Sequence, residues 1–190
     1  MATASKKPAT KIASRRTPAQ SKGTTPVGPD AIALLRADHK RVSDLYEAYE
    51  HTRSTAKKKA IVSKICLELS IHAQVEEEIF YPAVKAALKD KEMVPEAQVE
   101  HATLKELIAQ VKDKEPDGEL FDAKIKVMSE YTKHHVKEEQ TEMFPKARKT
   151  KLDMNELGAR LQARKDELMA NPDQMEAPPV PASPAMAATT

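Results

Sequence analysis

The chain contains one helical phrase written twice, and this repeat limits the possible folds more than any other feature. The segments IHAQVEEEIFYP and HHVKEEQTEMFP align on Pro82 and Pro145, 63 positions apart, and each carries a His-x-x-x-Glu pair. The segments DHKRVSDL and EHATLKEL, which begin at residues 38 and 100, match in the same way and supply one further histidine each. The repeat predicts two copies of one helical hairpin related by a pseudo-twofold axis.

Apolar residues spaced three and four apart predict the helices of these hairpins. We expect the first helix to be capped by Asp30, the second to begin near Ser54, the third to follow a loop at 89–95 and the fourth to follow 116–118. A capping-box pattern at Asp153 and Glu156 predicts a fifth, amphipathic helix that packs outside the others. With only 4 Gly and 4% aromatic residues, the composition also favours an all-α fold.

The composition changes at both ends of the chain. We predict a disordered basic arm over residues 1–29, a four-helix bundle over 30–150, an amphipathic C-terminal helix over 151–170 and a disordered Pro/Ala tail over 171–190. The arm lacks aromatic residues, which disfavours a nucleic-acid contact, although its composition also resembles a transit peptide. There is no apolar run of roughly 20 residues for a membrane span. The single cysteine, Cys66, fits a cytoplasmic protein.

The lengths of the predicted connections place the repeated polar residues at one height. Short loops favour antiparallel neighbours, in which residues at one level lie symmetrically about the turn. The midpoints between His39 and His72, between His101 and His135, and between Glu76 and His101 all fall in or beside predicted turns. Three independent connections therefore bring the four histidines, Glu76 and its repeat partner Glu139 together.

Histidine at position i and glutamate at i+4 share one helix face and can reach one ion. Two carboxylates and four imidazoles on an apolar seam are costly to bury without a counter-charge, and metal cations would supply it. Imidazole with carboxylate suits iron, manganese or zinc, and the twofold arrangement suits a dinuclear site. The alternative for a single His-x-x-x-Glu is a surface ion pair, and a purely structural bundle would make the shared register a coincidence.

Residues near the predicted ligands in the sequence are expected to have structural roles only. Glu77 and Glu138 are expected on solvated faces, His134 at the periphery, and Cys66 in the core. Tyr46 and Tyr131 are expected to pack in the core, with contact to a ligand as the alternative. We expect Pro82 and Pro145 to kink or end their helices just past the site.

The pattern His…His-x-x-x-Glu…His…His-x-x-x-Glu, with its Phe-Tyr-Pro and Phe-Pro endings, resembles the hemerythrin-like (HHE cation-binding) family over about residues 31–150. The resemblance implies an antiparallel up-down-up-down four-helix bundle and a pair of non-haem irons joined by an oxo or hydroxo bridge. Carried over residue by residue, it implies the following ligands, with the two glutamates in bridging positions: His39, His72, Glu76, His101, His135 and Glu139.

This sequence departs from the oxygen-carrying hemerythrins. Those proteins place His-x-x-x-His on the third helix, whereas Lys105 stands four positions after His101 here, and Glu139 replaces an aspartate at a different spacing. We therefore expect a di-iron protein that binds or reacts with O2, peroxide or nitric oxide, whether or not it is an enzyme. The alternative is an iron- or oxygen-responsive sensor in which metal occupancy stabilises the bundle. The sequence indicates no protein partner.

Overall fold

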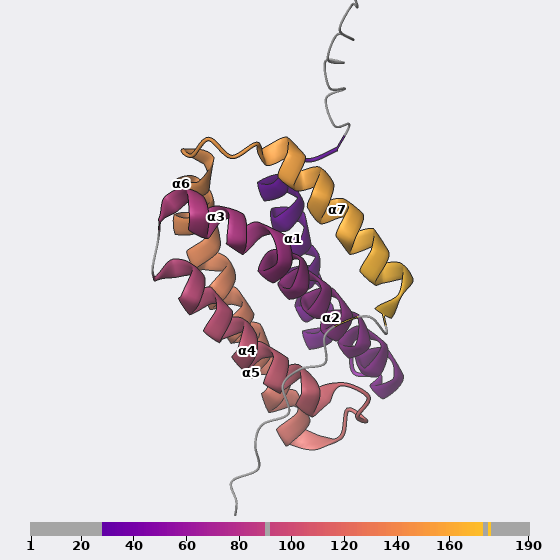
Figure 1. Ribbon diagram of the computed structural model, residues 1–190. Helices are drawn as coiled ribbons and strands as arrows, with labels where there is room; N and C mark the ends of the chain where they lie inside the picture. Colours follow the sequence, from indigo (N-terminus) through magenta and orange to yellow (C-terminus); the bar gives the residue numbers. More distant parts are fainter. Residues whose placement is uncertain (1–27, 90–91, 173–174, 176–190) are drawn as a thin grey trace, which may run out of the picture.

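A computed structural model describes residues 28–89, 92–172 and 175 of the chain. Four long helical segments form an antiparallel bundle, and a fifth helix packs on its outside (Figure 1). In chain order the segments are α1 (Ala31–Glu50); α2 (Thr55–Val75) continued by the π-helical turn η1 (Glu76–Phe80) and α3 (Tyr81–Leu88); α4 (Met93–Val111); α5 (Gly118–Glu138) continued by the π-helical turn η2 (Glu139–Met143) and α6 (Phe144–Arg148); and α7 (Met154–Ala170). The predicted all-α bundle with an extra C-terminal helix is confirmed.

Side-chain caps fix where three helices begin. The carboxylate of Asp30 accepts the backbone N–H of Ala33 at 2.9 Å, and the hydroxyl of Ser54 accepts that of Lys57 at 3.4 Å. Asp153 accepts the N–H groups of Asn155 and Glu156 at 2.9 and 3.0 Å. Each bond satisfies a donor that has no partner within the first helical turn.

We expected the two prolines to kink or end their helices, and the second of these outcomes is wrong. The chain stays helical beyond Pro82 to Leu88, and beyond Pro145 to Arg148. A π turn ends two residues before each proline. Its wider backbone gives room to the proline ring, which would otherwise meet a carbonyl of the preceding turn. In both copies this turn begins at the repeated glutamate, Glu76 or Glu139.

The hydrophobic core is divided into two clusters with a polar layer between them. The first cluster lies at the α3–α6 end and contains residues such as Leu35, Val75 and Phe144. The second lies toward the other end and contains residues such as Val42 and Met128. Each long segment therefore passes from one apolar cluster to the other through the level of the predicted ligands.

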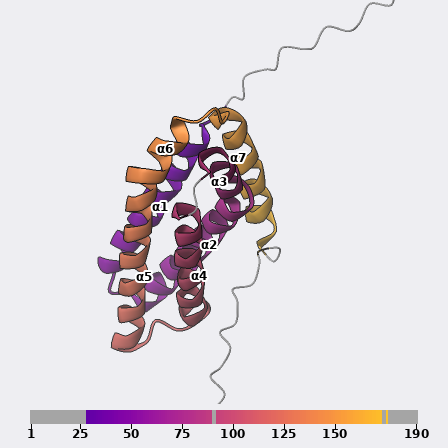
Figure 2. The same ribbon diagram turned by 60° about the vertical axis from the view of Figure 1, so that its left-hand side comes forward.

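Helix α7 lies along the outside of the α1–α2 hairpin (Figures 1 and 2). It buries Leu157, Leu161 and Leu168, as its amphipathic pattern predicted. At Gly158 the helix approaches the start of α1 so closely that an added Cβ would lie 2.4 Å from the carbonyl oxygen of Pro29. The α7 contact thus depends on the absence of a side chain at this position.

Most of the predicted basic arm (1–29) and of the Pro/Ala tail (171–190) lies outside the described residues. Within the described part of the chain, no helix combines the length and the apolar character needed to cross a bilayer.

Candidate metal centre

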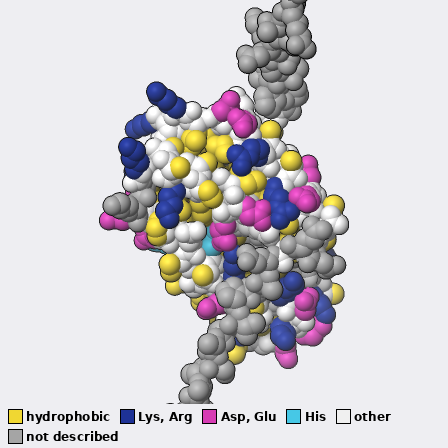
Figure 3. Space-filling view, in the orientation of Figure 1, with side chains coloured by type: hydrophobic (Ala, Val, Ile, Leu, Met, Phe, Trp, Pro, Cys, Tyr) yellow, Lys and Arg dark blue, Asp and Glu magenta, His cyan; other side chains and the backbone are white. Residues whose placement is uncertain are grey.

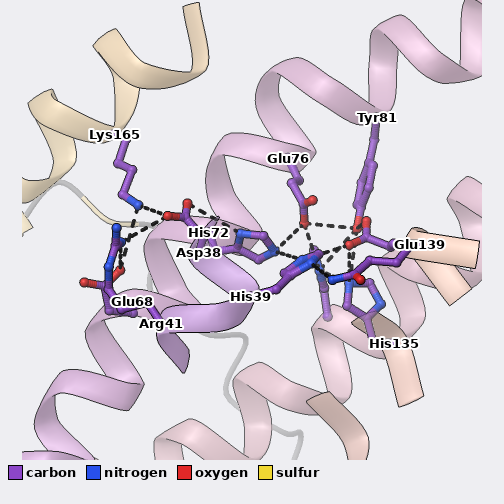
Figure 4. Close-up of polar contacts among 12 residues, drawn as sticks. Asp38, His39, Arg41, Glu68, His72, Glu76, Tyr81, His135, Glu139 and Lys165 are labelled. Carbon is purple, nitrogen blue, oxygen red and sulfur yellow. Dashed lines mark hydrogen bonds and ion pairs between the residues drawn. The ribbon is translucent and has the colours of Figure 1, made fainter. Parts of the chain in front are cut away.

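All six predicted ligands meet in one buried layer, which we call the His/Glu cluster, and Figure 4 labels five of them. The α-helices supply the histidines and the π turns supply the glutamates. The exposed fraction of each residue lies between 0 and 6%: His39, His72, Glu76, His101, His135 and Glu139. On the face drawn in Figure 3, histidine is visible only as one small patch.

The histidines form two pairs, one within each hairpin. The Nε2 atoms of His39 and His72 lie 3.0 Å apart, and those of His101 and His135 lie 3.1 Å apart. We call these the first pair and the second pair. In both pairs the Nε2 atoms face the cluster, which is how two imidazoles share one cation.

The two glutamates lie between the pairs. One oxygen of Glu76, Oε2, is 3.2 Å from Nε2 of His72 and 3.5 Å from Nε2 of His101. The Oε2 atom of Glu139 is likewise 3.2 Å from Nε2 of His39 and 3.6 Å from Nε2 of His135. Each carboxylate thus contacts one histidine of either pair and connects the two pairs.

The charges of the cluster are poorly balanced by protein groups alone. Burial and the neighbouring Glu139 raise the pKa of Glu76 well above its usual value. Burial also opposes the ionisation of Glu139, but the charge of His135 and the contact with His39 outweigh it, and its pKa is lowered. The buried Oε1 of Glu76 accepts no hydrogen bond from any described residue. Cations between the two pairs would satisfy this oxygen and allow both carboxylates to ionise.

Burial also keeps imidazoles of the cluster in the neutral form that binds metals. It lowers the pKa of His72 to about 4 and lowers the pKa of His101. For His135 burial acts in the same direction, but a hydrogen bond to Glu100 and the charge of Glu139 raise its pKa. Imidazole nitrogens and carboxylate oxygens are donors that suit iron, manganese or zinc, so the cluster fits a metal cation.

In each hairpin an acidic residue comes directly before the first histidine, His39 or His101. This acid faces the second histidine of the same pair. The Oε2 atom of Glu100 lies 2.7 Å from Nδ1 of His135, and Oδ2 of Asp38 lies 3.9 Å from Nδ1 of His72. Neither acid was predicted as part of the site from the sequence. Their matched places in the repeat, beside His101 and His39, were the available signal.

The residue after each cluster glutamate contacts the first histidine of the opposite hairpin, His101 or His39. The Oε1 atom of Glu77 lies 3.0 Å from Nδ1 of His101, and the amide nitrogen of Gln140 lies 3.1 Å from Nδ1 of His39. The expectation that Glu77 lies on a solvated face is therefore wrong. Its carboxylate is drawn inward because it accepts from His101 and also pairs with Lys105 at 2.7 Å.

The phenol of Tyr81 is a further member of the cluster that the sequence analysis did not identify. Its Oη lies 2.9 Å from Oε1 of Glu139, 3.2 Å from Oε2 of Glu76 and 3.3 Å from Nε2 of His101. Burial and the two carboxylates raise its pKa well above the usual value, so the phenol keeps its proton. At the matched position of the repeat, Phe144 stacks on His39 instead, with ring centroids 5.8 Å apart.

A buried ion pair connects the cluster to α7 (Figure 4). Lys165 of α7 donates to Oδ1 of Asp38, whose other oxygen faces His72. Burial opposes the ionisation of Asp38, but its contacts with His72 and Lys165 outweigh this and lower its pKa to about 2. Arg41 reaches both Asp38 and Glu68 at 3.0 Å. The fifth helix therefore contributes to the surroundings of a predicted ligand.

Cavities lined by described residues reach the cluster from more than one side. One of about 60 Å³ lies between α4 and η2 and has Glu100 and Glu139 in its wall. One of about 290 Å³ lies between α1 and α5 and is lined by His39 and Gln140, among others. One of about 10 Å³ lies against Val42.

The expectations for Cys66, His134 and Tyr46 are confirmed, and the one for Tyr131 is wrong. Cys66 is buried in the second apolar cluster, and burial raises the pKa of its thiol to about 11. His134 is peripheral, pairing with Glu138 at 3.2 Å. Tyr46 is in the core and contacts Thr132, whereas Tyr131 is exposed and therefore belongs neither to the core nor to the cluster.

Comparison with known proteins agrees with this geometry. The sequence model of the hemerythrin HHE cation binding domain matches residues 30–147, which span the bundle and all six predicted ligands. The crystal structure of a hemerythrin HHE cation binding domain-containing protein from Mycobacterium kansasii is similar with a TM-score of 0.65 at 20% identity. The match covers 75% of this chain and 89% of that one. At this identity the likeness shows the fold alone.

A curated relative is a DNA nickase from Nostoc sp., which is 25% identical over 111 residues. The match covers 58% of this chain but only 31% of the relative, so this chain spans less than a third of that protein.

Proposed function

The chain belongs to the hemerythrin HHE cation-binding domain family, and on this premise we propose that the His/Glu cluster holds two non-haem iron ions. We further propose that the loaded protein binds or reacts with a small oxidant: O2, peroxide or nitric oxide. The observation that carries the proposal is the position of Glu76 and Glu139, each between a histidine of the first pair and one of the second.

Iron bound there would supply one-electron chemistry and coordination positions for a small oxidant. The protein's part is to position the donors and to control protons. A donor set of four histidines and two carboxylates would leave coordination positions free for a small oxidant. The hydroxyl of Tyr81 lies beside both glutamates and can donate its proton to Oε2 of Glu76 or to Oε1 of Glu139.

A sensor role is the second candidate, and the link through α7 favours it. Lys165 reaches Asp38, which faces His72, so loading of the cluster and docking of an outer helix are physically connected. In that case metal binding would change the stability of α7 without sustained turnover of an oxidant.

Rapid mixing of iron-loaded protein with peroxide, O2 or nitric oxide separates the two roles. We expect consumption of more than one equivalent of one oxidant per chain, and loss of this consumption in Glu139→Gln. The matched control, Glu142→Gln, removes an exposed carboxylate of the same π turn and should behave as wild type. Stable iron binding without consumption of, or a spectral response to, any of the three oxidants would contradict the first role.

A further inference from the structure

We propose that the two metal positions are unequal, which rests on the proposed metal centre. The position beside the second pair, His101 and His135, takes its ion first and holds it more tightly. The matched positions 77 and 140 of the repeat set this difference, because one carries a carboxylate and the other an amide.

The group that contacts Nδ1 of His101 differs chemically from the group that contacts Nδ1 of His39. Glu77 presents a carboxylate oxygen to Nδ1 of His101, whereas Gln140 presents an amide to Nδ1 of His39 at almost the same distance. The two residues occupy equivalent positions after the bridging glutamates. The backbone arrangement is therefore shared, and only the side-chain chemistry is not.

A carboxylate at Nδ1 favours metal binding at Nε2. It accepts the Nδ1 proton, which leaves Nε2 unprotonated toward the cluster, and its charge makes the imidazole a stronger donor. The amide nitrogen of Gln140 instead donates toward Nδ1 of His39, which favours the opposite tautomer with the proton on Nε2. For His39 to bind a metal, this amide must turn to present its oxygen, which is a neutral acceptor.

The second histidines, His135 and His72, differ in the same direction: the carboxylate beside His135 is the closer one. His135 has Glu100 at 2.7 Å from its Nδ1, while His72 has Asp38 at 3.9 Å, beyond hydrogen-bond distance. Asp38 is held away by Lys165.

The charges around the two halves also differ. The first half has Asp38 and Glu68 facing the cations Lys165 and Arg41, next to the neutral Gln140. In the second half Glu77 pairs with Lys105, and Glu100 has only His134 and His135 as partners among the described residues. More uncompensated negative charge therefore lies around the second pair, which strengthens the attraction of a cation to it.

Calorimetric titration of the apo protein with ferrous iron under anaerobic conditions tests the inequality. We expect two binding steps, with the first at least about tenfold tighter, the typical effect of one outer carboxylate. His39→Ala should retain the tighter step and lose the weaker one, and His101→Ala should do the reverse. A tighter step that survives in His101→Ala would overturn the proposal.

Exchanging the side chains at the two matched positions gives the second test. Gln140→Glu should tighten the weaker step about tenfold, and Glu77→Gln should weaken the tighter step by a similar factor. Glu106→Gln, which removes an exposed carboxylate of α4, is the control and should change neither step. If two ions bind but Gln140→Glu tightens neither step, the inequality is refuted while the metal centre stands. If no variant and no wild-type sample binds iron, the proposed function fails as well.

Discussion

At the scale of single residues, the His/Glu cluster places side chains in an arrangement that is unfavourable without a bound cation. Glu76 is fully buried beside another carboxylate, and one of its oxygens accepts no hydrogen bond from a described residue. A buried carboxyl in such surroundings must either keep a proton or ionise against the charge of Glu139. This cost is expected of a site built for a ligand that the bare chain does not supply.

Replacing Glu76 by glutamine should therefore stabilise the apo protein and abolish dinuclear binding. The folded-state pKa of Glu76 is raised, so the stability it contributes is complete below its unfolded value and is lost as pH rises. The advantage of Glu76→Gln should thus grow from pH 5 to pH 8, by at most about 1.4 kcal/mol for each pH unit in which the two states differ by one proton. Urea unfolding of both apo proteins measures this. An advantage that stays constant with pH would mean that Glu76 is ionised at no cost, and one that shrinks would mean that the fold favours its ionisation.

The six predicted ligands were accessible to sequence reasoning because they occur twice in register on an apolar seam. Tyr81 could not be predicted in this way, because Phe144 stands at the matched position of the repeat. Two aromatic residues at matched positions indicate ordinary core packing. Glu77 was misjudged for a related reason. Helical phase alone places it toward solvent, whereas the π turn that begins at Glu76 and a contact from α4 bring it to His101.

At the scale of elements, the connections and caps were predictable and the π turns were not. The lengths of the loops fix which residues share a level, and the six side chains do meet. A proline in a helical pattern indicates a break or a kink, and sequence alone does not distinguish these from a local π turn. In this protein both cluster glutamates, Glu76 and Glu139, lie at the first position of a π turn.

The packing of α7 on the start of α1 decides whether the substitution Gly158→Ala lowers or raises the free energy of unfolding. An alanine Cβ at position 158 would meet backbone atoms of residues 29–31 at 2.4 to 2.8 Å, so Gly158→Ala should destabilise the protein by about 1–3 kcal/mol. On an undocked helix the same change should stabilise by up to about 1 kcal/mol, because alanine favours helix. Chemical unfolding gives the sign. Arg160→Ala, at an exposed position of α7, serves as the control and should have little effect.

At the scale of the whole molecule, the polar layer separates two apolar clusters, so the middle of the bundle contributes little hydrophobic stabilisation of its own. Ions bound there would connect all four long helical segments at their common level. Because metal binds the assembled cluster much better than the unfolded chain, it should stabilise the entire bundle by mass action.

The most direct test of the metal centre is the difference in melting temperature between iron-loaded and apo protein at pH 7.5 and at pH 5. At pH 7.5 we expect the loaded form to melt at least about 5 °C higher when free iron exceeds its dissociation constant a hundredfold. Protons compete with metal for imidazole, whose reference pKa is about 6.5, so the difference is present at the higher pH and should shrink toward pH 5. Equal melting temperatures at pH 7.5 would contradict the account, because the six side chains would then not bind metal as a buried cluster.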